Sequence, residues 1–309
     1  MLGASLAVLA MFTFGCCMVV VSFAMRGLSS GPGSMLSAAA GVPAGLAVAI
    51  AQFGFGDGVA MPSWRAVAEF AVAGIFSTYL GRWLVFKSVE LIGPSRAAAI
   101  QSLSPLITAL FGWLFLSELL GPLGFVGIAL GMAGLFAMSL GGQPQQPAAS
   151  AAVPVRQGGF VLGSLLVGLG SAAAYSGSHV FRADAVREWN EPLLGAAIGV
   201  VAGLAALVFA SRKQLPGYFR EIRANRLGAA VYLGVGAMQF LAQSLVIASM
   251  KYIPASLAAL ISMATPLVVM PISYFVLRKQ ENLTPAVVLG ICITFAGIAL
   301  VVLYGRPAA

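Results

Sequence analysis

Long apolar runs separated by short polar breaks make up most of the chain. A helix that crosses the hydrocarbon core of a bilayer needs about 20 consecutive, mostly apolar residues. Ten segments reach that length, and they predict ten membrane-spanning helices. The predicted spans cover residues 2–25, 34–53, 66–86, 95–116, 122–141, 159–181, 192–210, 226–248, 254–277 and 284–304.

Turn-forming residues explain where the apolar runs stop. Ser29 to Gly33 follows the first run, and Gly121-Pro122 separates the fourth run from the fifth. Residues 142–158 are polar and rich in proline, which predicts a flexible linker between two halves of the chain. Residues 211–226 contain five of the basic side chains and are expected to form the most basic loop.

Composition agrees with a bilayer environment. The chain is 60% hydrophobic and only 8% charged, with a mean hydropathy of +0.97, whereas soluble proteins carry roughly 25% charged residues. The net charge of +8 does not indicate a nucleic-acid partner, because the basic residues lie mostly between apolar runs, where they set membrane topology. The first run lacks a basic n-region and is too long for a signal peptide, so we expect a retained helix.

The two halves of the sequence resemble each other. The stretch 85–106 matches 246–267 at an offset of 161 residues, and the turn Glu118-Leu-Leu-Gly-Pro122 matches Glu281-Asn-Leu-Thr-Pro285. The identical pairs include Ser88 and Ser249, Ile92 and Ile253, Ser95 and Ser256, Ala97 and Ala258, Ile100 and Ile261, and Pro105 and Pro266. We infer a duplication.

Each half contains five predicted spans, which is an odd number, so the second half must enter the membrane in the opposite orientation. Inverted repeats of this kind place a substrate site near the midplane and support alternating access. The predicted fold is therefore an all-α polytopic membrane protein. Its repeats, 1–141 and 159–305, surround a central cavity.

A known family shows the same pattern. The stretch Leu91-Ile-Gly-Pro-Ser-Arg-Ala-Ala-Ala99, with Ser104-Pro105, and its second-half counterpart Tyr252-Ile-Pro-Ala-Ser-Leu-Ala-Ala259 carry the resemblance. On these residues the chain resembles the EamA-type members of the drug/metabolite transporter superfamily. The resemblance implies a secondary transporter, an exporter of small polar or amphipathic metabolites such as amino acids, in the cell (inner) membrane. A multidrug exporter of the same superfamily is the alternative.

Among the residues of the predicted spans, Arg82 has the highest expected free-energy cost of insertion into the bilayer. A charge at the bilayer centre costs about 2.5–3.5 kcal/mol on insertion scales, so such residues usually face a cavity. The repeat mate of Arg82 is Gln243, and Gln239 lies one turn earlier. These side chains are candidates for binding a substrate carboxylate, with Arg82 as a bidentate clamp. The alternative is that Arg82 extends to the nearby membrane interface.

Two prolines sit near the middle of predicted spans four and nine. A proline inside a helix frees the carbonyl four residues earlier, which for Pro105 and Pro266 is that of Gln101 and Ser262. In hydrocarbon a freed carbonyl needs a partner or a water-lined cavity. The symmetric kinks favour a cavity at Gln101 and Ser262, against the alternative of simple packing kinks.

Other polar and aromatic side chains are weaker candidates. His179 could couple protons to transport or could be a hydrogen-bonded structural residue. Tyr79, Trp83 and Tyr175 could form an aromatic wall for flat substrates or belong to an interface belt. Glu69 is interpreted as an interface charge rather than a proton site.

The sequence contains no signal for catalysis or metal binding. It has no nucleophile motif, phosphate-binding loop or zinc signature, and only one histidine. We therefore expect neither an enzyme nor a bound cofactor, and the inverted halves argue against a channel. The expected partners are a small-molecule substrate and membrane lipids. Gly127-x-x-x-Gly131 and Gly199-x-x-x-Gly203 predict close helix approach, and the choice between a monomer and a homodimer stays open.

Orientation is the point on which charge and resemblance disagree. Of the 17 Lys and Arg residues, five fall on the side shared by both termini and twelve on the opposite side. Cytoplasmic loops normally hold the excess, which predicts outward-facing termini. The resemblance implies that both termini face the cytoplasm.

Overall fold

The computed structural model describes most of the chain, and every regular element in the described residues is a helix. The described residues are 2–24, 28–55, 61–84, 87–88, 100–101, 103–118, 121–141, 162–265, 267–268, 272 and 285–304. The predicted linker, 142–158, therefore lies outside them.

The contacts group the helices into two compact units, Met1–Tyr79 with Phe181–Ile253 and Leu80–Val180 with Pro254–Ala309. The first unit holds α1 (Leu2–Ala24), α2 (Ser30–Phe55), α3 (Trp64–Gly74), α9 (Pro192–Ala210), α10 (Leu215–Ala224) and α11 (Arg226–Ser249). The second unit holds α6 (Ser104–Leu116), α7 (Pro122–Gly141), α12 (Ala255–Met263) and α14 (Pro285–Tyr304). The π-helix η1 (Ile75–Gly81) and α8 (Leu162–Glu188) each contribute residues to both units.

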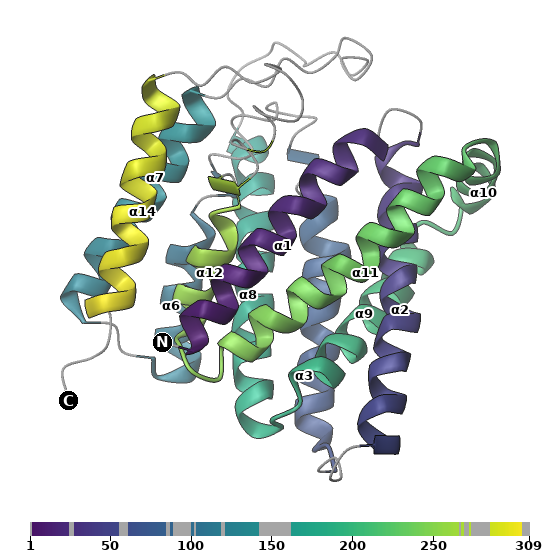
Figure 1. Ribbon diagram of the computed structural model, residues 1–309, viewed down its shortest axis with the longest axis horizontal. Coiled ribbons are helices and arrows are strands. Elements are labelled where there is room, and N and C mark those ends of the chain that lie inside the picture. The colour runs from purple at the N-terminus through teal and green to yellow at the C-terminus, as the bar shows by residue number, and fades with distance from the viewer. Residues whose placement is uncertain are drawn as a thin grey trace. The chain divides into compact units, whose positions relative to one another are not determined.

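Each unit draws its helices from both halves of the sequence. In the first unit α1 packs along α11, and α2 packs against α9 and α11 (Figure 1). In the second unit α7 and α14, the last spans of the two halves, lie side by side (Figure 1). Three described helical stretches are long and apolar enough to cross a bilayer, Gly31–Gln52, Pro192–Ala210 and Arg226–Ser249, and several shorter apolar helices accompany them.

The predicted spans agree with the observed helices best where the ends carry strong signals. The bounds of α7 and α9 coincide with the prediction, since both begin at a proline, which suits the first turn of a helix. By contrast, α8 continues to Glu188, beyond the predicted end at residue 181. The expectation that 211–226 is a loop was wrong, because this segment contains α10.

The prediction that Pro105 kinks the interior of a span was also wrong. Leu103 is the N-cap of α6, and Pro105 lies in its first turn. A proline disfavours helical backbone at the residue before it but fits the start of a helix. The fourth span is therefore interrupted before Ser104 rather than kinked at Pro105. The repeat mate Pro266 lies outside the described residues.

Glycines set the closest helix contacts inside each unit. A Cβ on Gly74 would stand 1.9 Å from the carbonyl oxygen of Gly199, so α3 and α9 meet backbone to backbone. In the second unit a Cβ on Gly297 would stand 2.3 Å from the backbone nitrogen of Gly131 and 2.6 Å from the oxygen of Gly127. Both predicted small-residue motifs thus serve packing within the chain.

Large apolar side chains are exposed on many helices. Leu46 is 60% exposed, Phe115 71% and Phe209 69%. A soluble protein rarely leaves so much apolar surface in water. Hydrocarbon is the solvent that these helix faces require.

Candidate functional site

Polar side chains at the start of α6, and Gln101 just before it, form hydrogen bonds with α8 in the second unit. Ser171 on α8 donates from Oγ to Oε1 of Gln101 at 2.9 Å. The hydroxyls of Ser104 and Ser176 lie 3.0 Å apart, and Ser176 also donates to the carbonyl oxygen of Ser104 at 2.9 Å. Thr108 donates to the same carbonyl at 2.8 Å. We call Gln101, Ser104, Thr108, Ser171 and Ser176 the hydroxyl cluster.

The hydroxyl cluster is buried. The exposed fraction is 0% for Ser104, Thr108 and Ser176 and 2% for Ser171. Its hydrogen bonds join α6 and Gln101 to α8 within the second unit. The structure places the side-chain oxygen of Gln101 in this cluster, and a substrate cavity at its backbone carbonyl stays a prediction.

Three more buried serines of the second unit have hydroxyls with no hydrogen-bond partner among the described residues. They are Ser88, Ser178 and Ser256. These hydroxyls are polar groups within a mostly apolar set of buried side chains. Ser88 and Ser256 belong to the repeat-matched pairs, but neither they nor Ser178 and the serines of α8 were predicted as site residues, because serine is common in membrane helices and its spacing carries little information.

The other predicted site residues of the second unit are Arg82, Trp83, Tyr175, His179 and Ser262. Arg82 is partly buried, and Trp83 next to it is 55% exposed. Tyr175 and His179 lie on α8, where His179 is only 7% exposed. The hydroxyl of Ser262 donates to the carbonyl oxygen of Ala259 within α12.

The remaining predicted residues belong to the first unit. Gln239 and Gln243 lie one turn apart on α11 and are partly buried. Nε2 of Gln243 is buried and has no hydrogen-bond partner among the described residues. Arg82 and its repeat mate Gln243 thus fall in different units, and their convergence on one substrate stays a prediction.

Tyr79 lies in η1, a π-helix that immediately precedes Arg82. Such bulges are rare and occur often at functional sites. Ser77 within η1 donates to the carbonyl oxygens of Ala73 and Gly74 and accepts a 2.8 Å hydrogen bond from the buried guanidinium of Arg182. The π-helix therefore has a charged partner that fixes its geometry.

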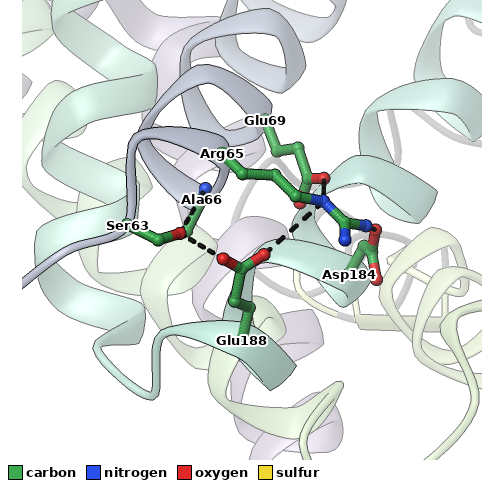
Figure 2. Close-up of polar contacts among 6 residues, drawn as sticks. All are labelled: Ser63, Arg65, Ala66, Glu69, Asp184 and Glu188. Carbon is green, nitrogen blue, oxygen red and sulfur yellow. Dashed lines mark hydrogen bonds and ion pairs between the residues drawn. The ribbon is translucent and has the colours of Figure 1, made fainter.

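A second polar site surrounds the N-terminus of α3 in the first unit. Arg65 contacts Glu69 at 2.8 Å, Asp184 at 2.5 Å and Glu188 at 3.5 Å, so one guanidinium serves three carboxylates (Figure 2). Ser63 caps α3 by accepting from the backbone nitrogen of Ala66, and its hydroxyl also donates to Glu188 (Figure 2). We call Arg65, Glu69, Asp184 and Glu188 the Arg65 cluster.

The Arg65 cluster ties α3 to the end of α8. Hydrogen bonds to Glu69 and then Asp184 raise the pKa of Arg65, so its positive charge is secure. The side chain of Glu69 is 13% exposed, and its Oε2 has no hydrogen-bond partner among the described residues. The signal for the cluster was the spacing of four between Arg65 and Glu69, but no ion pair was predicted, because Glu69 was interpreted as an interface charge and the predicted span ended at residue 181, before Asp184 and Glu188.

Metal binding has no support in the described part of the chain. There, no three His, Cys, Asp or Glu side chains lie close enough together to hold a metal ion.

Comparisons with known proteins assign the chain. The profile of the EamA-like transporter family matches residues 1–140 and 162–303. A solved crystal structure with 16% sequence identity matches 98% of this chain and 96% of its own, with a TM-score of 0.68, and shows the same fold. No curated protein sequence matches the chain.

The two matched regions confirm the predicted fold, a multi-pass membrane protein with ten spans in two inverted repeats. They also confirm that the chain is a transporter rather than an enzyme. Since the family profile covers nearly the whole sequence, this chain belongs to the EamA-like transporter family.

Proposed function

We propose that this transporter exports small polar or amphipathic metabolites, such as amino acids, by secondary transport with alternating access. The observation that carries the proposal is the interrupted fourth span with its buried hydroxyl cluster. Interrupted spans at repeat-related positions characterise the binding sites of inverted-repeat transporters, because the broken helix exposes backbone groups to a substrate.

Arg82 supplies the preference for a carboxylate. Its guanidinium offers two parallel donors that match the two oxygens of a carboxylate. Gln239 and Gln243, on α11 of the first unit, are proposed separately to bind polar groups of a substrate. Tyr79, Trp83 and Tyr175 cover its apolar part, and His179 takes up or releases a proton during the cycle.

Purified protein in liposomes tests the proposal. Saturable uptake of amino acids is the expected result, and binding is found first by a thermal-shift screen across amino acids and cationic drugs. Arg82→Ala should weaken carboxylate binding by roughly 10-fold to 100-fold, as expected for a charge-assisted pair worth about 1.5–3 kcal/mol. Arg187→Ala is the matched control, since it removes one exposed arginine of α8 from outside the proposed site.

The multidrug alternative predicts a different outcome. A cationic drug is repelled by Arg82, so its binding should strengthen or stay unchanged in Arg82→Ala. If every carboxylate substrate found in the screen binds Arg82→Ala as tightly as the unmodified protein, the clamp is wrong. Flux that fails to saturate with substrate would instead contradict alternating access.

A further inference from the structure

The segment 211–226 carries the strongest concentration of positive charge in the described residues. It contains five basic side chains and one acidic side chain, a net charge of +4. The basic residues Arg212, Lys213, Arg220, Arg223 and Arg226 are all exposed. Arg220 and Arg223 lie in α10 (Leu215–Ala224), Arg212 and Lys213 lie in the turn before it, and Arg226 begins α11.

The inner face of α10 is fixed to the first unit. The carboxylate of Glu221 accepts hydrogen bonds from the backbone nitrogen and the hydroxyl of Ser29. Ile222 packs against the buried pair Leu28 and Tyr232. Since these contacts turn the only acidic group of the segment inward, the basic side chains of the outer face have no acidic neighbour within the segment.

The outer face combines positive charge with exposed apolar groups. Phe219 is 53% exposed between the basic residues, and Leu227 directly after Arg226 is 78% exposed. The guanidinium of Arg212 lies 4.8 Å from the ring centre of Phe209, which is itself 69% exposed. Aromatic and aliphatic side chains beside Lys and Arg are the composition of a helix lying in the headgroup region of a bilayer.

We propose that α10 and its flanking turns form a binding surface for anionic phospholipid headgroups of the surrounding bilayer. The helix joins two membrane helices, α9 and α11, so the bilayer surface is the partner already within reach. Guanidinium groups pair well with phosphate. A soluble nucleic acid or acidic protein would gain nothing from the exposed Phe219 and Leu227, whereas the bilayer accepts them.

The test uses the full-length protein in detergent micelles to which phosphatidylglycerol or phosphatidylcholine is added. Native mass spectrometry counts the lipids retained, and thermal shift reports stabilisation. The altered protein carries Arg220→Gln, Arg223→Gln and Arg226→Gln. The matched control carries Lys87→Gln, Arg187→Gln and Lys251→Gln, which removes the same charge from residues outside segment 211–226.

Phosphatidylglycerol should be retained by the unmodified protein and by the control, and phosphatidylcholine by neither. Each basic residue near an anionic surface contributes about fivefold in affinity, so the three changes in segment 211–226 should weaken retention about a hundredfold at low salt. A variant with Lys at the same three positions should keep most of the retention, which separates charge from a folding defect.

Three results would overturn the proposal. The first is an equal loss of phosphatidylglycerol retention in the triple Arg→Gln variant and in the control, which would show a general effect of charge. The second is full retention of phosphatidylglycerol by the triple Arg→Gln variant. The third is displacement of phosphatidylglycerol by millimolar inorganic phosphate, which would make the site one for free anions rather than for a membrane surface.

Discussion

Glu118 joins a turn to the beginning of another helix. Ser117 before it has a left-handed backbone, with φ of 52°, and the carboxylate oxygens of Glu118 accept from the backbone nitrogen of Ala255 at 3.1 and 3.2 Å. The first N–H groups of a helix have no partner within that helix, so Glu118 caps α12. The sequence placed Glu118 in a repeated turn but could not identify α12 as its partner.

Glu118→Ala should destabilise the protein by about 1 kcal/mol, since the loss of a helix cap costs about 0.5–2 kcal/mol. The apparent melting temperature of the detergent-purified protein measures the effect. Glu118→Gln keeps a carbonyl oxygen that can accept the bond and should lose less. Equal melting temperatures for the alanine variant and the unmodified protein would mean that the cap is energetically irrelevant.

Helix ends were predictable where a local signal marked them. Pro122 and Pro192 fixed the beginnings of α7 and α9, because proline fits a first turn. Hydropathy failed at α8, whose last turns carry Arg182, Asp184 and Glu188. It failed again at α10, since ten residues with a polar outer face do not form an apolar run. As a result, neither the Arg65 cluster nor the helix α10 was predicted, because the tertiary contacts that stabilise these charged turns are not visible in the sequence.

The close packing of α7 against α14 predicts that one added methyl group between them destabilises the protein. Gly297→Ala places a methyl group against the backbone of Gly131 and Gly127, and overpacking of this kind costs about 1–3 kcal/mol. We expect a clearly lower melting temperature. Gly234→Ala on α11 is the control, because no atom lies within 4 Å of its added methyl group. A loss of similar size at Gly234 would show that helix flexibility, not close packing, is what the glycines provide.

The described ends of the first unit differ in charge, which bears on the orientation of the whole molecule. The end with α10 carries a net charge of +4 over residues 211–226. At the other end, Arg65, Arg182, Arg187 and Lys251 are balanced by Glu69, Asp184, Glu188 and Glu191. Gly3 lies against Tyr252 and Ile253, just beyond the end of α11, so the beginning of α1 belongs to the balanced end.

The positive-inside rule then predicts that α10 faces the cytoplasm and that the N-terminus faces outward. Ten spans return the chain to the side from which it started, so the C-terminus faces outward as well. A reporter that fluoresces only in the cytoplasm, fused after Ala309, should stay dark in intact cells, and a reporter active only outside should be active there. Charge reversal at Arg220, Arg223 and Arg226 should shift part of the population towards cytoplasmic termini. Bright cytoplasmic fluorescence of the unmodified fusion would instead show that the orientation implied by the family resemblance prevails over the charge of the α10 end.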